Sequence, residues 1–209
     1  MLRIQNTEVS GLTRAIRASG NAMSIGEINT SLSSPIEEKD LKRASNLGNF
    51  PAGSAHDHFL VGIHVQFDIC YPQYWTIEAE RYHNFEIITS QSKMHKLSMI
   101  GKQDNFSSMF NQYVEPDIIK KIKTLIAMYN DIDGVLYPKD KYTFFMRCIS
   151  NLPMGFEMWM TCDLTYLQIK TMCLQRKNHK LKEDWGEFCR WAVEELPLFS
   201  HLTGITLTK

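Results

Sequence analysis

A strict alternation of apolar and polar side chains between Val61 and Ile69 limits the fold more than any other feature of the sequence. Odd positions of this run carry Val, Ile, Val, Phe and Ile, whereas even positions carry Gly, His, Gln and Asp. Successive side chains of a β-strand point to opposite faces, so a period of two predicts a strand with one packed face and one polar face. The chain therefore needs further elements that cover the apolar face of a sheet.

Helices and further strands are predicted on both sides of this strand. Apolar residues at helical spacing and capping signals predict helices over residues 8–20, 35–47, 72–82, 116–129, 138–149, 163–176 and from 183 onward. β-Branched and aromatic content predicts a strand over 85–90, and alternation predicts another over 155–162. The Ser-, Asn- and Gly-rich segment 21–33 is expected to be a mobile loop. Because helices and strands interleave, the sequence predicts a single α+β domain over residues 1–209, with a small, mostly antiparallel sheet and helices packed on it.

Capping signals assign the start of two of these helices. Ser34 and Glu37 form a predicted capping box, with Pro35 at the first helical position. Asp163 is predicted to cap the helix that ends at Arg176. In the last helix, four residues are expected to form the buried face: Trp185, Phe188, Cys189 and Ala192.

Composition and charge exclude several classes of function. The 209 residues are 44% apolar, which is enough for a substantial core, and 23 Lys and Arg are matched by 23 Asp and Glu. Nucleic-acid-binding domains usually carry a basic excess, so sequence-independent binding to DNA or RNA is not expected here. The charge balance does not exclude a binding site for a small anionic ligand, since such a site needs only two or three cations. No apolar run approaches the ~20 residues of a membrane span.

The five cysteines indicate a reducing compartment. Their number is odd, and no two of them lie closer than eleven residues in the sequence. Cysteines used in this way pack as small hydrophobic residues. We therefore expect a cytoplasmic protein, which includes the host cytoplasm for a phage-encoded chain, and none of the cysteines is expected to have the electropositive surroundings of a nucleophile.

Two clusters of polar residues flank the predicted strand 61–69. His56-Asp57-His58 offers two imidazoles and a carboxylate, but a metal site needs further ligands and no other His or Cys lies close at suitable spacing. A structural turn or a ligand contact therefore remains for this cluster, and no metal is expected. Arg81 and His83 are either solvated surface or part of a site, because Ser90 and Ser92 follow one strand length later with hydroxyl groups that suit a phosphate or a pyrimidine edge.

Two arginines in the second half of the chain are candidates for binding an anion. Arg147 lies among apolar residues, so a buried guanidinium here needs either a carboxylate such as Glu157 or a bound phosphate. Arg176 lies at a predicted helix C-terminus, where the helix dipole favours cations in any case.

The order of these features resembles that of the flavin-dependent thymidylate synthase family over about residues 55–197. In that family an acidic residue and a histidine precede a strand, as Asp57 and His58 do here. The family's basic triad Arg-His-Arg reads Arg81-Tyr82-His83 in this chain.

The resemblance continues after the triad. Serines follow it at Ser90 and Ser92, Arg147 precedes Leu152-Pro153, and Arg176 closes a later pair, as an arginine does in the family. The chain also resembles divergent, phage-associated relatives of that family.

The resemblance implies an α+β fold and a homotetramer whose sites are built from several subunits. It implies FAD binding by His58, Arg81 and His83, and binding of a pyrimidine deoxynucleotide by Ser90, Ser92, Arg147 and Arg176. In the family reaction, methylenetetrahydrofolate supplies a methylene group to C5 of dUMP, and FAD reduced by NADPH completes the methyl group. Because the triad departs from Arg-His-Arg, two alternatives stay open: a non-catalytic nucleotide-binding or regulatory protein that kept the fold, and an enzyme that modifies a pyrimidine differently.

Overall fold

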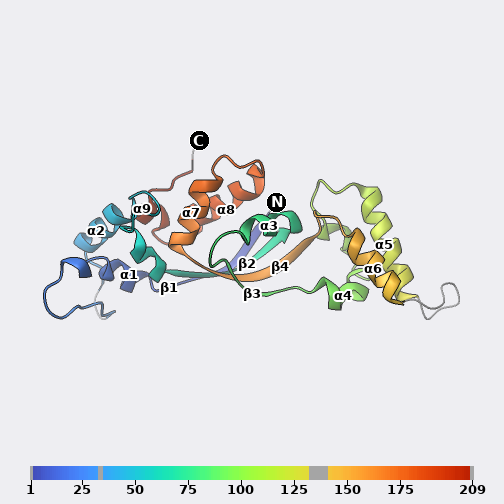
Figure 1. Ribbon diagram of the computed structural model, residues 1–209, viewed down its shortest axis with the longest axis horizontal. Helices are drawn as coiled ribbons and strands as arrows, with labels where there is room; N and C mark the ends of the chain where they lie inside the picture. The colour runs from blue at the N-terminus through green and yellow to red at the C-terminus, as the bar shows by residue number, and fades with distance from the viewer. Residues whose placement is uncertain (1, 33–34, 132–140, 208–209) are drawn as a thin grey trace. The chain divides into compact units, whose positions relative to one another are not determined.

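A computed structural model describes residues 2–32, 35–131 and 141–207 (Figure 1). Four strands form one sheet in the order β1-β2-β4-β3. Their bounds are Arg3–Ser10 for β1, His64–Pro72 for β2, Glu86–Ser90 for β3 and Glu157–Thr165 for β4. The predicted small, antiparallel sheet with packed helices is confirmed.

Side-chain contacts show the direction of the two central strands. His64 of β2 contacts Asp163 of β4 at 3.2 Å, and four residues further along β2 Asp68 accepts a 2.6 Å hydrogen bond from Thr161. Residue numbers on β4 therefore fall as those on β2 rise, which is the register of an antiparallel pair.

The alternation that predicted β2 is seen in its burial. Val65, Phe67 and Ile69 are buried, while the polar side chains between them are exposed or half-buried. The strand begins later than predicted, because Val61 still belongs to the 3₁₀ helix η2 (His58–Gly62). Its inner face therefore matches the sequence pattern, but both predicted ends were wrong, since the strand also continues beyond Ile69 to Pro72.

The chain forms two compact units. The first comprises Met1–Ile69, Ala79–Ile88 and Thr161–Lys209, and the second comprises Cys70–Glu78 and Thr89–Met160. Helices of the first unit are α1 (Leu12–Ala18), η1 (Asn21–Met23), α2 (Glu38–Gly48), η2, α7 (Tyr166–Arg176), α8 (Lys182–Glu195) and α9 (Phe199–Thr203). The second unit holds α4 (Lys93–Ile100), η3 (Phe106–Met109), α5 (Pro116–Asn130), α6 (Lys141–Asn151) and all but the last residue of α3 (Gln73–Ala79). The single domain expected over residues 1–209 stays a prediction.

Aromatic side chains of α8 pack on the sheet in the first unit. Trp191 contacts Phe67 of β2 at 4.6 Å between ring centroids, and Phe188 contacts both Trp185 and Trp191. Trp185, Phe188 and Trp191 are buried, whereas Cys189 is half-buried. Burial of large aromatic rings contributes much of the energy of such a core.

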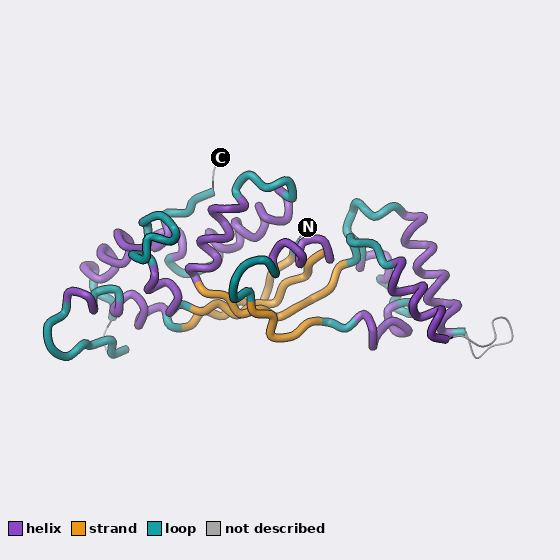
Figure 2. Tube along the Cα trace, viewed as in Figure 1, coloured by secondary structure: helices purple, strands orange, loops and turns teal. Residues whose placement is uncertain are grey.

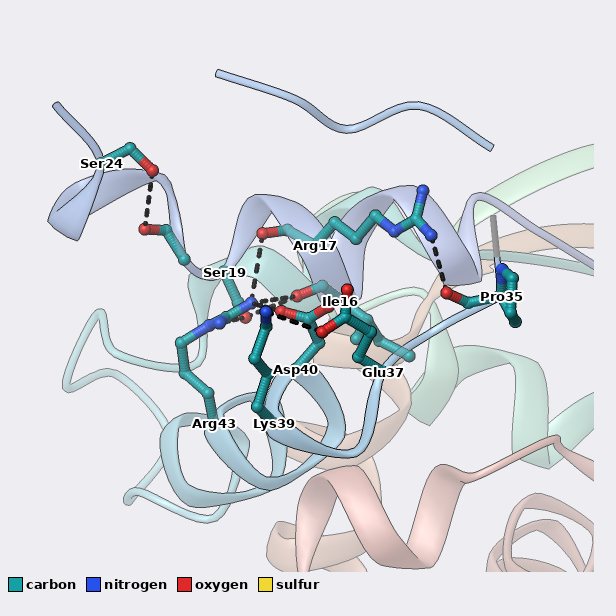
Figure 3. Close-up of polar contacts among 10 residues, drawn as sticks. Ile16, Arg17, Ser19, Ser24, Pro35, Glu37, Lys39, Asp40 and Arg43 are labelled. Atoms are coloured by element: carbon teal, nitrogen blue, oxygen red, sulfur yellow. Dashed lines mark hydrogen bonds and ion pairs between the residues drawn. The ribbon is translucent and has the colours of Figure 1, made fainter. Parts of the chain in front are cut away.

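Arg43 of α2 binds the C-terminal end of α1, as Figure 3 shows. Its Nη2 donates to the carbonyl oxygens of Ile16 and Arg17 at 3.4 Å each, and its Nε donates to the Ser19 hydroxyl at 3.2 Å. Asp40, one turn earlier on α2, pairs with the same guanidinium at 2.7 Å. The last carbonyls of a helix lack partners within it, so this arginine satisfies them and ties α1 to α2.

The second unit has its own core. Phe110 contacts both Phe106 and Phe156, at 5.2 and 5.3 Å between ring centroids, and it forms an antiparallel bridge with Phe156. Residues of α4, α5 and α6 complete this cluster, namely Leu97, Ile100, Ile122, Leu125, Ile126 and Cys148. The helical spacing that predicted α5 thus corresponds to a buried face.

Several predicted helix boundaries differ from the structure. Residues 8–10 belong to β1, so the first helix begins only at Leu12. Thr165 caps α7 in place of Asp163, because β4 extends to Thr165, whose side chain and that of Gln168 form a capping box. The predicted capping residue Ser34 and the predicted helix start at 138–140 lie outside the described residues. No helix in the described part of the chain is long and apolar enough to cross a membrane.

Candidate functional site

The side chain of Arg176 lies between two aromatic rings of the first unit. Its Nε donates a 2.7 Å hydrogen bond to the Tyr82 hydroxyl. Its guanidinium carbon is 5.1 Å from the Tyr82 ring centroid and 4.9 Å from that of Trp185. Such stacking holds the plane of the guanidinium while its two Nη atoms carry four further N–H groups. The last residue of α7 is thereby joined to the triad segment 81–83.

Arg176 lines a cavity of about 660 Å³, which we call the basic cavity. Its walls come from α7, α8, the segment 49–51 and the segment 203–207. Five cationic residues line it: Lys170, Arg176, Lys177, Lys182 and Arg190. None of the described residues that line it is acidic. An anion would therefore meet cations and no carboxylate at these walls.

Lys170 is the buried member of this set and is held by three acceptors. Its Nζ donates to the carbonyl oxygens of Gly48 and Phe50, at 2.8 and 2.7 Å, and to the Asp57 carboxylate at 2.6 Å. The backbone of α2 comes this close to its neighbours only without a side chain at Gly48, where a Cβ would lie 2.0 Å from the Leu202 carbonyl oxygen. An ammonium group has three N–H donors, and these three acceptors match them. Lys170 therefore has a structural role.

The remaining cations differ in their surroundings. Arg190 forms an ion pair with Glu187, one turn earlier on α8. Lys177 and Lys182 are exposed, and Arg176 is half-buried. The other cations that line the basic cavity are therefore Arg176, Lys177 and Lys182.

Tyr82 lines a second cavity of about 570 Å³, which we call the histidine cavity. His64 and His83 line it together with Asp163 and Glu86. His64 Nδ1 is 3.2 Å from the Asp163 carboxylate. Apolar walls come from Val61 and Leu167 and from the Tyr82 ring. Tyr82 thus links the two cavities, since it lines the second and its hydroxyl accepts from an arginine that lines the first.

Gln168 of α7 fixes the backbone of the triad segment beside this cavity. Its Nε2 donates to the His83 carbonyl oxygen at 3.1 Å and also to that of Asn84. Asn84 has φ 60, in the left-handed region that asparagine tolerates better than most residues. The same Gln168 side chain closes the capping box with Thr165, so the start of α7 and the turn at 83–84 are positioned together.

The structure brings together some of the predicted site residues. His83 lines the histidine cavity and Arg176 lines the basic cavity. His58 and Arg81 are exposed residues of the first unit that line neither cavity. Ser90 and Ser92 belong to the second unit, where Ser92 caps α4 by accepting from the His95 N–H at 3.2 Å.

Arg147 differs from the sequence-based expectation. We expected a guanidinium among apolar residues to be buried and paired with Glu157 or a phosphate. Instead Arg147 is exposed on α6, and its guanidinium carbon lies 5.3 Å from the ring centroid of Phe144, one turn earlier. Among residues 144–148 only Cys148 is buried, so no burial cost forces a charged partner on Arg147.

Sequence reasoning missed three residues that shape these cavities. Lys170 follows Ile169 on the buried side of α7, and a lysine there signals a buried acceptor. His64 and Asp163 occupy polar positions of adjacent strands, and only the strand register places them together. Among the described residues, no three His, Cys, Asp or Glu side chains are grouped as metal ligands.

Comparison with solved structures identifies the fold. No protein-family model and no curated protein matches the sequence. Among the solved structures that match, two do so over almost the whole length, both of flavin-dependent thymidylate synthase ThyX from Helicobacter pylori with FAD and dUMP. One has a TM-score of 0.70 and covers 96% of this chain and 97% of that chain; the other has 0.71 and covers 97% of each. Identity is 11% in both.

This chain has the ThyX fold. The predicted α+β architecture is thereby confirmed. At 11% identity the likeness shows the fold alone, and the chemistry must be argued from the residues of this chain.

The two cavities differ in the ligand groups that they suit. Phosphates fit the basic cavity, because Arg176, Lys177 and Lys182 offer donors and positive charge. The histidine cavity does not fit a pyrophosphate, because the carboxylates of Asp163 and Glu86 would repel it. Its apolar walls and polar rim fit an uncharged ring, such as a pyrimidine or the ring system of a flavin.

Proposed function

We propose that this protein binds a pyrimidine deoxynucleotide in the first unit, with the phosphate in the basic cavity at Arg176. The observation that carries the proposal is the 2.7 Å hydrogen bond from Arg176 to Tyr82. It joins the two segments that the family resemblance assigns to the nucleotide and to the flavin. The ThyX fold, whose solved examples hold dUMP and FAD, supports the same assignment.

Charge favours this placement of the phosphate. Arg176 already has its plane set by two aromatic rings, so little further ordering is needed when its Nη groups bind an oxyanion. A charge-assisted hydrogen bond of this kind contributes roughly 1.5–3 kcal/mol. Lys177 and Lys182 would add exposed charge at the same walls.

The proposed reaction is methylation of dUMP at C5, with NADPH and methylenetetrahydrofolate as co-substrates. FAD, when bound, supplies the redox chemistry. His83 and Tyr82 would border its ring system from the histidine cavity, and His58 and Arg81 remain predicted contacts of the flavin. Ser90, Ser92 and Arg147 remain predicted contacts of the nucleotide. We propose a homo-oligomer, since the resemblance implies sites shared between subunits.

A second candidate is a nucleotide-binding protein that lacks the redox step. It is favoured by one observation: Tyr82, which replaces the middle histidine of the family triad, is held by Arg176 beside a cavity that contains two carboxylates. Such a site retains a cation for a nucleotide but offers poor surroundings for the pyrophosphate of FAD. The two candidates share the nucleotide and differ only in the flavin.

Two measurements on the purified protein separate them. Titration calorimetry with dUMP tests the shared claim, and absence of binding at millimolar dUMP would refute both candidates. An ultraviolet-visible spectrum, before and after addition of FAD, tests the redox step, since bound oxidised flavin absorbs near ~450 nm. Binding of dUMP together with flavin supports the synthase, and dUMP binding without flavin supports the non-catalytic protein.

A further inference from the structure

Two cysteines on neighbouring helices share the wall of the basic cavity. Cys173 belongs to α7 and Cys189 to α8, and these helices lie side by side (Figures 1 and 2). Both residues line the basic cavity, and their thiols are close enough for each to shift the pKa of the other. They are sixteen positions apart in the sequence, so the packing of the helices, and no local motif, brings them together.

The two thiols have different roles in this pair. Cys173 is buried, with 4% of its surface exposed, whereas Cys189 is half-buried. Interaction with the Cys173 thiol lowers the pKa of Cys189, while interaction with Cys189 and burial raise the pKa of Cys173. Cationic side chains line the same cavity. The sequence-based expectation that no cysteine has the electropositive surroundings of a nucleophile stays a prediction.

We propose that Cys173 and Cys189 form a reversible disulfide, with Cys189 as the thiolate that reacts first and a peroxide as the oxidant. The Cys189 sulfur attacks one peroxide oxygen, so that an S–O bond forms, the O–O bond breaks and hydroxide leaves to become water. The Cys173 sulfur then attacks the sulfur of the Cys189 sulfenic acid. The S–S bond forms as the S–O bond breaks, and hydroxide leaves with the Cys173 proton as a second water. In sum, two thiols lose two electrons and two protons, and one peroxide takes them up to become two waters.

The position of the pair gives this bond a consequence. Cys173 is one helical turn before Arg176, and Cys189 is one turn after Trp185, on which the Arg176 guanidinium stacks. A covalent link at this point fixes α7 against α8 beside that stack. Oxidation should therefore restrict the walls of the basic cavity.

The other cysteines provide an internal reference. Cys70, Cys148 and Cys162 are buried. Burial raises the pKa of Cys148, and burial together with the nearby Asp68 carboxylate raises the pKa of Cys162 to about 12. These thiols should stay reduced in the folded protein under conditions that oxidise Cys189.

Peptide mass spectrometry tests the proposal on the folded, full-length protein. The protein is treated with hydrogen peroxide, the remaining thiols are alkylated after denaturation, and the peptides are mapped. We expect one linkage, between the peptides of Cys173 and Cys189, which dithiothreitol reverses. Oxidation spread over all five cysteines, a link between two chains, or unmodified Cys189 would overturn the proposal.

Two variants separate the roles of the thiols. Cys189→Ser should abolish peroxide consumption at this pair. Cys173→Ser, or Cys173→Ala if the serine variant does not fold, should leave a Cys189 sulfenic acid that dimedone traps. If Cys189→Ser still forms a sulfenic acid at Cys173, the assignment of the attacking thiolate is wrong.

Discussion

Lys170 and Asp57 form a 2.6 Å ion pair in which only 1% and 2% of the two side chains are exposed. The pair joins α7 to the turn before η2, where the family resemblance places a histidine contact at His58. Lys170 Nζ also donates hydrogen bonds to two carbonyl oxygens, those of Gly48 and Phe50. A buried charge that keeps its partners is tolerated, whereas one that loses its partner is costly.

Replacing Lys170 by Met should lower the free energy of unfolding by about 3–5 kcal/mol, because the Asp57 carboxylate is left buried without its partner. Urea denaturation followed by circular dichroism measures the change. The control is the exposed ion pair Lys39–Glu37, with N–O 2.7 Å, for which Lys39→Met should leave the denaturation midpoint unchanged.

The double variant Lys170→Met with Asp57→Leu distinguishes a buried charge from simple loss of packing. It should be more stable than Lys170→Met alone, since no unpaired charge remains. A double variant that is less stable than either single variant would contradict the account of this pair.

The stability of the sheet should depend on the ionisation of Asp68. Asn6 donates to one carboxylate oxygen at 2.8 Å and Thr161 to the other at 2.6 Å, and these bonds hold the pKa of Asp68 below its ordinary value of 3.8. A lowered folded-state pKa gives stability that is present above pH 3.8 and lost as the pH falls through the folded-state value.

Urea midpoints between pH 6 and pH 2.5 should therefore fall less steeply in Asp68→Asn than in the native sequence, with the difference confined to the region below about pH 4. Asn6→Ala should move the carboxyl pKa, followed by NMR titration, back toward its ordinary value. Parallel curves for the native and Asp68→Asn proteins would show that this carboxylate does not couple β1, β2 and β4.

Tyr82→Phe should weaken dUMP binding about three- to tenfold, because the lost hydroxyl orients Arg176 and a bond of about 1 kcal/mol corresponds to that range. The ring stays, so its stacking on the guanidinium is kept. Tyr142→Phe, at an exposed tyrosine of α6, is the matched control and should leave the affinity unchanged. Tighter dUMP binding by Tyr82→Phe would mean that the hydroxyl competes with the nucleotide for Arg176.

The protein should be a homo-oligomer in solution, and we expect a tetramer of about four times the 24.2 kDa chain mass. Sites shared between subunits need such an assembly. Light scattering at micromolar protein gives the mass directly. A monomer under these conditions would contradict the claim that sites are shared between subunits.

The fold was predictable where a pattern is local. The alternation of apolar and polar residues revealed β2, because its apolar side chains face a core. Apolar residues at helical spacing revealed α5. Strand β1 was missed, because its side chains are exposed or only half-buried and its apolar residues do not alternate strictly. Asp163 was mistaken for a cap, since an acidic residue before a helix looks the same whether it caps the helix or pairs with His64 across a strand.

The site was predictable residue by residue but not as an arrangement. Arg176 and the 81–83 segment were both singled out, yet their contact spans ninety-four positions and depends on how α7 packs. Lys170 was overlooked, because a lysine in an amphipathic helix is normally solvated and nothing nearby in the sequence reveals Asp57 as its partner. The Arg147 expectation was wrong, because apolar neighbours in the sequence need not surround the same helix face.

Titration calorimetry that compares dUMP with deoxyuridine, in the native protein and in Arg176→Ala, tests the central claim most directly. If Arg176 binds the phosphate, the variant should lose about tenfold or more in dUMP affinity while its weaker affinity for deoxyuridine stays unchanged. Lys123→Ala, at an exposed lysine of α5, controls for the loss of one positive charge. Unchanged dUMP affinity in a folded Arg176→Ala protein, or an equal loss for both ligands, would contradict the placement of the nucleotide phosphate in the basic cavity.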